Sequence, residues 1–322
     1  MRPMNSPRNI YIKLSPQGSQ LTFDYAIIQL KIIMFSFARM ANLETEDYSV
    51  KKVGLIFLFI CVNLAWGQEN TGSVKELKYE LKKDFLDSLQ WAYQGSYRQF
   101  QGWQNLILWA GAIATTGYFL DHDKRISNNL VQKNDNVHLA EFVGKGSALF
   151  NTPLFALGMY YWGRSRKDDK MVQFSKEYFS ALVLALVETN LIAIIPVHDR
   201  PDQKELSFWE KVVRGQSSFP SGHTIGYAVL GFKTLQFYGP LMALLPLTFT
   251  ALTGFERVHS RKHYISDIVG ATFISFMASE GVRYATGYKN NHPFYKWVFE
   301  HDVALNFIRK DQAPGLMFSF SY

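Results

Sequence analysis

Apolar residues in this chain gather into long runs that are separated by short polar stretches. The runs cover residues 103–120, 142–162, 178–197, 223–238, 240–256 and 265–281. Runs of this length without two-residue alternation are typical of helices rather than strands. The pattern therefore predicts an all-α protein, a bundle of about six helices that is membrane-embedded or membrane-associated.

The residues before and after these apolar runs have different patterns of apolar and polar positions. Leu77, Leu81 and Phe85 recur at helical spacing within residues 68–102, which predicts an amphipathic N-terminal helix. The only strand-like alternation is the final GLMFSFSY, which predicts one short strand. The expected organisation is an extension with a signal peptide (1–67), the amphipathic helix (68–102), a helical domain (103–285) and a C-terminal tail (286–322).

Residues 50–70 have the three-part pattern of a secretory signal peptide. Two lysines precede about twelve mostly apolar residues, and small residues follow at the spacing of a cleavage site. The apolar run is short for the roughly 20 residues that a spanning helix needs, so an uncleaved anchor is the weaker alternative. We expect cleavage before Gln68. A signal this far from Met1 also suggests that Met34 or Met40 is the true start.

The amino-acid composition excludes some kinds of binding partner and some kinds of site. Of the 322 residues, 48% are apolar, which is enough for a sizeable core or several membrane spans. The net charge of +7 is spread along the chain without a Lys/Arg block, so it favours an anionic surface or substrate and not nucleic acid. Cys61 is the single cysteine and lies in the signal region, so the mature protein would have no disulfide and no zinc–thiolate site.

Membrane insertion is less strongly indicated than helix formation. Glu188 and Lys233 lie in the middle of apolar runs, and the mean hydropathy of the chain is near zero. The loop 163–177 holds five Lys/Arg, which favours the cytoplasmic side. We expect a cell-envelope location, as a membrane protein or an exported periplasmic protein, with the functional face outside the cytoplasm. A soluble exported bundle stays open.

Several polar residues flank the ends of the apolar runs. In an up-and-down bundle, alternate helix ends fall on one face, so these residues should converge even though they are distant in sequence. They are Arg200, the Pro-Ser-Gly-His run that contains Ser221, Gly222 and His223, then Arg257, His263 and Asp267.

These residue types suit the chemistry of a phosphoryl group. Guanidinium groups bind phosphate oxygens with two parallel hydrogen bonds. A glycine at a helix start lets backbone N–H groups approach an anion closely. One imidazole can attack phosphorus while another protonates the departing oxygen. Asp267 follows His263 by four residues, so the carboxylate can hold one ring nitrogen of His263 and leave the other nucleophilic.

Three motifs follow in order along the chain: Arg200-Pro201, the run Pro220–His223, and Arg257 with His263 and Asp267. They resemble the three signature motifs of the type 2 phosphatidic acid phosphatase and vanadium haloperoxidase superfamily, over roughly residues 140–285. The resemblance implies a metal-independent phosphatase with no cofactor, which acts through a phosphohistidine on a lipid phosphate or another phosphorylated small molecule. It implies that His263 is the nucleophile, Asp267 its orienting carboxylate and His223 the general acid. It implies a phosphate cradle made by Arg200, Ser221, Gly222 and Arg257.

The sequence departs from the family pattern at two positions. Ala193 stands where the first motif has a lysine, and Glu256 stands where the third motif usually has a serine. Glu256 could pair with an arginine and weaken its attraction for substrate, and a cation from the loop after Arg200 (Lys204, Lys211 or Arg214) could substitute for the lysine. The alternative functions are a vanadate-dependent haloperoxidase and a degenerate, non-catalytic protein that binds phospholipid head groups.

Two other polar clusters suggest metal ligands on inspection, namely His198-Asp199 and Asp121-His122-Asp123. Both are flanked by Lys or Arg, and solvated polar turns are the commoner explanation of such clusters. We therefore predict no metal site. His259 lies within the third motif without a role in the pattern and is assigned to a loop.

Overall fold

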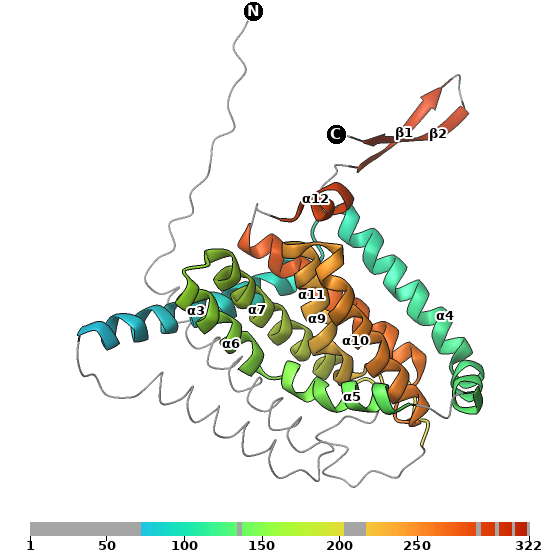
Figure 1. The fold of residues 1–322 in the computed structure, drawn as a ribbon. Coiled ribbons are helices and arrows are strands. Elements are labelled where there is room, and N and C mark those ends of the chain that lie inside the picture. Colours follow the sequence, from blue (N-terminus) through green and yellow to red (C-terminus); the bar gives the residue numbers. More distant parts are fainter. Residues whose placement is uncertain are drawn as a thin grey trace, which may run out of the picture.

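The computed structural model describes residues 72–133, 137–202, 217–287, 291–299, 303–310 and 313–320 (Figure 1). The predicted signal peptide, Cys61 and the three loop cations Lys204, Lys211 and Arg214 lie outside these residues. The helices are α3 (Gly72–Arg98), α4 (Trp103–Lys133), α5 (His138–Phe150), α6 (Pro153–Arg166), α7 (Asp169–Ile192), the 3₁₀ turn η1 (Gly222–Thr224), α9 (Ile225–Tyr238), α10 (Pro240–His259), α11 (Ile265–Thr286) and α12 (Pro293–Phe299). Two strands follow, β1 (Val303–Lys310) and β2 (Ala313–Phe320). The predicted helical bundle is confirmed.

Three helices form the centre of the bundle. α7, α9 and α11 each pack against the other two, and their buried side chains include Tyr178, Ile225 and Met277. The remaining long helices cover this centre: α3 packs on α7 and α11, α4 on α11, α10 on α9, and α6 on α7 (Figure 1). The central helices also carry most of the predicted motif residues at their ends, so the packed core determines where those ends lie.

The apolar run 142–162 is two helices, not one. α5 ends at Phe150, and α6 begins at Pro153 with Thr152 as its N-cap. The Thr152 hydroxyl accepts a hydrogen bond from the Leu154 N–H over 3.4 Å, and proline at the first helical position needs no hydrogen-bond partner for its nitrogen. A single hydropathy run thus conceals a helix boundary that capping chemistry sets.

The C-terminal tail forms a hairpin where one short strand is predicted. β1 and β2 pair in antiparallel register from Val303 opposite Phe320 to Lys310 opposite Ala313. A lone strand would leave its backbone N–H and C=O groups without partners, and β1 supplies those partners. The alternation in the last residues predicted β2 alone because β1 has no comparable pattern.

The charges that interrupt the apolar runs face the protein interior. Lys233 on α9 and Glu177 on α7 are fully buried and form an ion pair of 2.9 Å. Glu188 on α7 accepts a hydrogen bond from the side-chain amide of Gln99. Buried charges need such partners because their desolvation is costly. These charges are therefore part of the packing between helices.

Large apolar side chains remain exposed on the outer helices. Two described helices, α10 and α11, are long and apolar enough to cross a membrane, although α11 is mostly buried within the bundle. Exposed apolar residues include Trp103, Ile107 and Ile113 on α4, Phe142 on α5, Leu241, Met242, Leu244 and Leu245 on α10, and Ile194 and Ile195 after α7. An apolar surface of this extent is typical of an interaction site for a membrane or another protein.

A close contact between α5 and α9 fixes the start of α9. Asn151, which follows α5, donates from its side-chain nitrogen to the Gly222 carbonyl over 3.2 Å and accepts from the Gly226 N–H over 2.7 Å. Gly226 lies so near the end of α5 that a Cβ atom there would meet the carbonyl carbon of Phe150 at 2.5 Å. The absence of a side chain at Gly226 is thus required by the packing.

We expect Gly226→Ala to lower the free energy of unfolding by about 1–3 kcal/mol, because the new methyl group would collide with backbone that cannot rotate away. Gly111→Ala on α4 is the matched control, since a Cβ there meets nothing within 4 Å. The control should be neutral or more stable by up to about 1 kcal/mol, because alanine is the better helix former. Denaturant unfolding followed by circular dichroism measures both. Equal stability of the two variants would contradict the close contact.

Candidate active site

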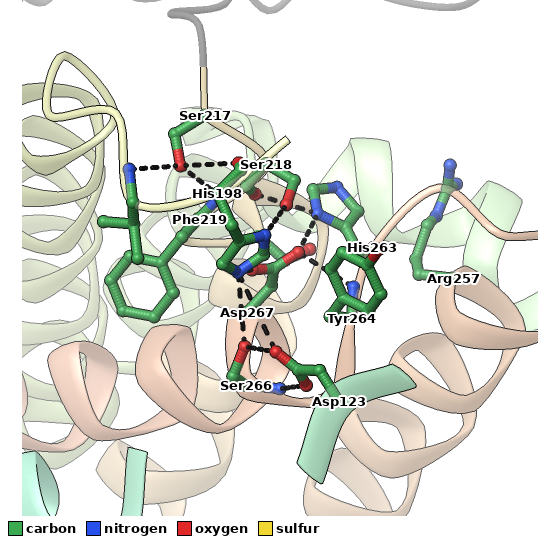
Figure 2. Close-up of polar contacts among 12 residues, drawn as sticks. Asp123, His198, Ser217, Ser218, Phe219, Arg257, His263, Tyr264, Ser266 and Asp267 are labelled. Carbon is green, nitrogen blue, oxygen red and sulfur yellow. Dashed lines mark hydrogen bonds and ion pairs between the residues drawn. The ribbon is translucent and has the colours of Figure 1, made fainter. Parts of the chain in front are cut away.

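Four helix ends meet at one face of the bundle. The loop after α7, the start of η1, the end of α10 and the start of α11 lie together. Figure 2 shows side chains from the loop after α7, from the segment before η1, and from the regions at the end of α10 and the start of α11. The rings of His223 and His263 have their centroids 5.8 Å apart. The structure thus brings together two histidines whose motifs are separated by a complete helix hairpin.

Asp267 orients the ring of His263. Nδ1 of His263 lies 3.1 Å from the Asp267 carboxylate oxygen Oδ2 and 3.0 Å from the Ser218 carbonyl oxygen. Both partners can only accept, so Nδ1 carries the proton and the neutral ring presents the lone pair of Nε2. A ring held in this tautomer is suited to act as a nucleophile through Nε2.

Asp267 also organises the local backbone. It is fully buried in the first turn of α11, and its Oδ2 accepts the Tyr264 N–H over 2.9 Å. A carboxylate in this position is stabilised by the N-terminal end of the helix dipole. The Asp267 carbonyl accepts the Ser221 N–H over 3.1 Å, which ties the Pro-Ser-Gly-His segment to α11.

The Ser221 N–H is therefore already used, although the sequence predicts that backbone N–H groups at this turn face an anion. Ser221 is fully buried, and none of the residues that the structure describes forms a hydrogen bond with its hydroxyl. Ser221 could contact a phosphate only through that hydroxyl. Gly222 is partly exposed, and its carbonyl is held by Asn151.

The two predicted arginines lie at different depths. Arg257 is 7% exposed at the end of α10, and its carbonyl accepts the His263 N–H over 3.2 Å. Its Nε lies 2.8 Å from Oε2 of Glu256, so the ion pair that the sequence suggests is present. Arg200 is half-buried in the loop after α7. That loop is joined to the Pro-Ser-Gly-His segment by the Ser218 N–H, which donates to the His198 carbonyl over 3.2 Å.

His198 and Asp123 lie against the site, which corrects their assignment to solvated turns. Figure 2 shows Asp267 between His198 and His263. Nε2 of His198 lies 3.1 Å from Oδ1 of Asp267 and 3.9 Å from Oδ2 of Asp123. Asp123 is buried in the C-terminal half of α4 and accepts from both the N–H and the hydroxyl of Ser266. No sequence signal joins these residues, because the packing of α4 on α11 brings Asp123 to the site.

The carboxylates change the ionisation of their neighbours. Burial disfavours the charged form of His198, but the interaction with Asp267 outweighs it, so the pKa of His198 is raised above its ordinary value. Burial and the nearby carboxylates, Asp123 foremost, raise the pKa of the Tyr264 phenol. Among the described residues, no group of three His, Cys, Asp or Glu side chains has the arrangement of a metal site.

Comparison with known proteins finds a family to which these residues are similar. Residues 174–291 match the PAP2 superfamily, and the seven predicted site residues all lie inside that range. This segment of the chain is therefore similar to the PAP2 superfamily. This similarity supports a phosphatase-type hydrolase.

Among solved structures, the chain is similar to a transmembrane PAP2-type phosphatidylglycerolphosphate phosphatase from Bacillus subtilis, with 17% identity, a TM-score of 0.40, and coverage of 56% of this chain and 95% of that one. No curated protein matches the chain. Asp123 lies outside the PAP2 segment, and Ala193 lies within it as the buried C-cap of α7. The position where the family motif has a lysine therefore carries no charge.

We expect the stabilisation that His198 provides to depend on pH. Because the pKa of His198 is raised in the folded protein, its ion pairing is fully present below the ordinary histidine pKa of about 6.5 and is lost as pH rises through the higher folded value. The difference in Tm between the wild type and His198→Gln, measured from pH 5 to 9, should be largest at the acidic end and shrink above neutrality. His122→Gln is the control, because His122 stacks on Tyr118 of its own helix. A His198→Gln difference that does not vary with pH would contradict this ionisation.

Proposed function

We propose that this protein is a phosphatase that hydrolyses a phosphomonoester or pyrophosphate of a lipid through a phosphohistidine on His263, without a metal ion. The observation that carries the proposal is the fixed tautomer of His263, whose Nδ1 proton is held by Asp267 and the Ser218 carbonyl while His223 faces the same space.

The first half-reaction transfers the phosphoryl group to the protein. Nε2 of His263 attacks phosphorus, and the bond from phosphorus to the leaving oxygen breaks. His223 gives a proton to that oxygen, so the alcohol or phosphate leaves neutralised. Asp267 stabilises the positive charge that His263 gains as its lone pair is used.

The second half-reaction regenerates the site. His223, now neutral, takes a proton from water as the water oxygen attacks the phosphohistidine. The phosphorus–nitrogen bond breaks, its electron pair returns to Nε2, and inorganic phosphate departs. In both steps the guanidinium groups of Arg200 and Arg257 and the Ser221 hydroxyl neutralise or bind the phosphoryl oxygens.

The exposed apolar surface supports a lipid substrate. Asp123 is the point at which α4 contacts the site. Trp103, at the start of α4, lies about 30 Å from Asp123 along the helix axis, which is close to the thickness of the hydrocarbon layer of a bilayer. The apolar residues of α4 and α10 lie in the half of the bundle away from the site. This arrangement would place the phosphate-binding face at the membrane surface and the acyl or prenyl chain beside the bundle.

The exposed isoleucines after α7 agree with this orientation. Ile194 and Ile195 directly precede the loop that carries His198 and Arg200, and their side chains are 65% and 58% exposed. Apolar side chains next to a phosphate site can contact the first methylene groups of a lipid while its head group is bound. They have no such use for a soluble sugar phosphate.

We expect His263→Asn to lower phosphate release by at least about a thousandfold, because the covalent step has no other nucleophile in this position. His259→Asn is the matched control, since His259 ends α10 and packs against the ring of Phe255. The control should retain wild-type turnover. Assays use purified protein in EDTA with phosphatidate, a prenyl pyrophosphate and a soluble chromogenic monoester.

Distinct results in this assay count against distinct parts of the proposal. Wild-type turnover by a folded His263→Asn variant would exclude the phosphohistidine, and loss of wild-type activity in EDTA would exclude the metal-independent mechanism. Faster turnover of the soluble monoester than of both lipids would exclude the lipid substrate. Bromide oxidation by peroxide with added vanadate, without phosphate release, would favour the haloperoxidase.

Glu256→Gln should bind phosphate more tightly. The Glu256 carboxylate lies 2.8 Å from Nε of Arg257 and competes with the substrate for that guanidinium group. Glutamine removes the charge but keeps an acceptor, so Arg257 is not left without a partner. We expect inorganic phosphate to inhibit the variant about three- to tenfold more strongly, corresponding to about 1 kcal/mol of recovered attraction. Unchanged or weaker inhibition would show that Arg257 does not contact the substrate.

A further inference from the structure

His198 is held between two buried carboxylates and contacts the one that orients the proposed nucleophile. Nε2 of His198 lies 3.1 Å from Oδ1 of Asp267, whereas His263 approaches the other oxygen, Oδ2. On the far side, Oδ2 of Asp123 lies 3.9 Å from the same nitrogen. The proposed mechanism assigns no part to His198 or Asp123.

Both ring nitrogens of His198 face hydrogen-bond acceptors. Nδ1 lies 3.1 Å from the Asp199 carbonyl oxygen, which can only accept, and 3.1 Å from the Ser218 hydroxyl, which can accept while its own hydrogen points elsewhere. Nε2 faces the Asp267 carboxylate and, at 3.4 Å, the Ser266 hydroxyl oxygen. The Ser266 hydroxyl donates its hydrogen to Asp123 over 2.5 Å, so it also presents a lone pair to His198. A ring with acceptors on both sides is satisfied when both nitrogens carry protons.

We propose that His198 is a positioning residue for the reaction, an imidazolium that fixes the Asp267 carboxylate so that its other oxygen orients His263. The proposal rests on the phosphatase function proposed above. His198 occupies Oδ1 and His263 occupies Oδ2, so the carboxylate cannot rotate without losing one of its two imidazole partners.

Charge balance provides a second reason for this assignment. Asp123 and Asp267 are both buried, and two neighbouring carboxylates repel each other unless a cation lies between them. The other groups that face His198 are the Tyr264 ring at 4.9 Å and the Ser218 hydroxyl at 3.1 Å, and neither supplies a positive charge. The imidazolium of His198 therefore allows both carboxylates to stay ionised.

The cluster of His198, Asp267 and Asp123 is not confined to the segment that matches the PAP2 superfamily, because Asp123 lies outside that segment. It is contributed by α4, outside residues 174–291, and it holds the Ser266 N–H over 3.0 Å at the start of α11. α4 thus supplies the second carboxylate of the cluster and also caps the helix on which Asp267 lies.

Kinetics of His198→Phe and His198→Gln test the proposal. Phenylalanine removes the charge and the donor, whereas glutamine removes the charge and keeps a donor. We expect kcat to fall about 10- to 100-fold for phenylalanine and less for glutamine. Losses of this size are found when a group that orients a functional side chain, without touching the substrate, is removed. KM should change less than about threefold, because His198 does not bind the phosphate. His122→Gln should leave both constants unchanged. A folded His198→Phe variant with wild-type kcat, or with a change in KM alone, overturns the proposal.

A spectroscopic measurement tests the same role without turnover. In protein labelled with ¹⁵N-histidine, the wild type should show a single His263 tautomer with a protected Nδ1–H signal. His198→Phe should broaden that signal or add the Nε2–H tautomer, and His122→Gln should leave it unchanged. An unchanged His263 signal in His198→Phe overturns the proposal whatever the kinetics show. If the wild type releases no phosphate from any ester, the proposed function fails. This measurement still decides whether His198 holds Asp267 in the position that orients His263.

Discussion

The buried carboxylate of Asp267 is the interaction on which the candidate site depends. It accepts the Tyr264 N–H at the start of α11, receives Nδ1 of His263 on Oδ2, and pairs with His198 on Oδ1. A fully buried carboxylate is stable only when such partners offset its desolvation, so these groups are held together by a common requirement. The same residue therefore sets the helix start, the tautomer of one histidine and the location of another.

The bundle makes this arrangement possible by fixing where its helices end. Asn151 and Gly226 bring the start of α9 against the end of α5, and the Ser221 N–H joins the preceding turn to the carbonyl of Asp267. The buried Lys233–Glu177 pair links α9 to α7 in the half of the bundle away from the site. Because rigid packing holds both ends of α9, His223 is placed opposite His263 without a direct hydrogen bond between the rings being needed.

The helical architecture was largely predictable, and the errors have local causes. Long apolar runs predicted the positions of the main helices, but the boundary between α5 and α6 is set by the Thr152 cap and Pro153, which a hydropathy pattern does not register. The hydropathy pattern also does not show that α7 ends at Ile192, five residues before the end of the apolar run. The partner strand β1 lacks clear alternation, so the hairpin was seen only as a single strand.

What the sequence by itself determined is the chemistry that depends on short spacing. Asp267 contacts His263 because residues four apart meet at the start of a helix. Glu256 and Arg257 are adjacent in sequence, so their ion pair also depends on short spacing alone. Only the tertiary structure decided that His198 and Asp123 join them, since Asp123 and Ser266 are 143 residues apart in sequence. Contacts at that separation depend on which helix faces pack together, and this is a property of the whole core that no local pattern of residues encodes.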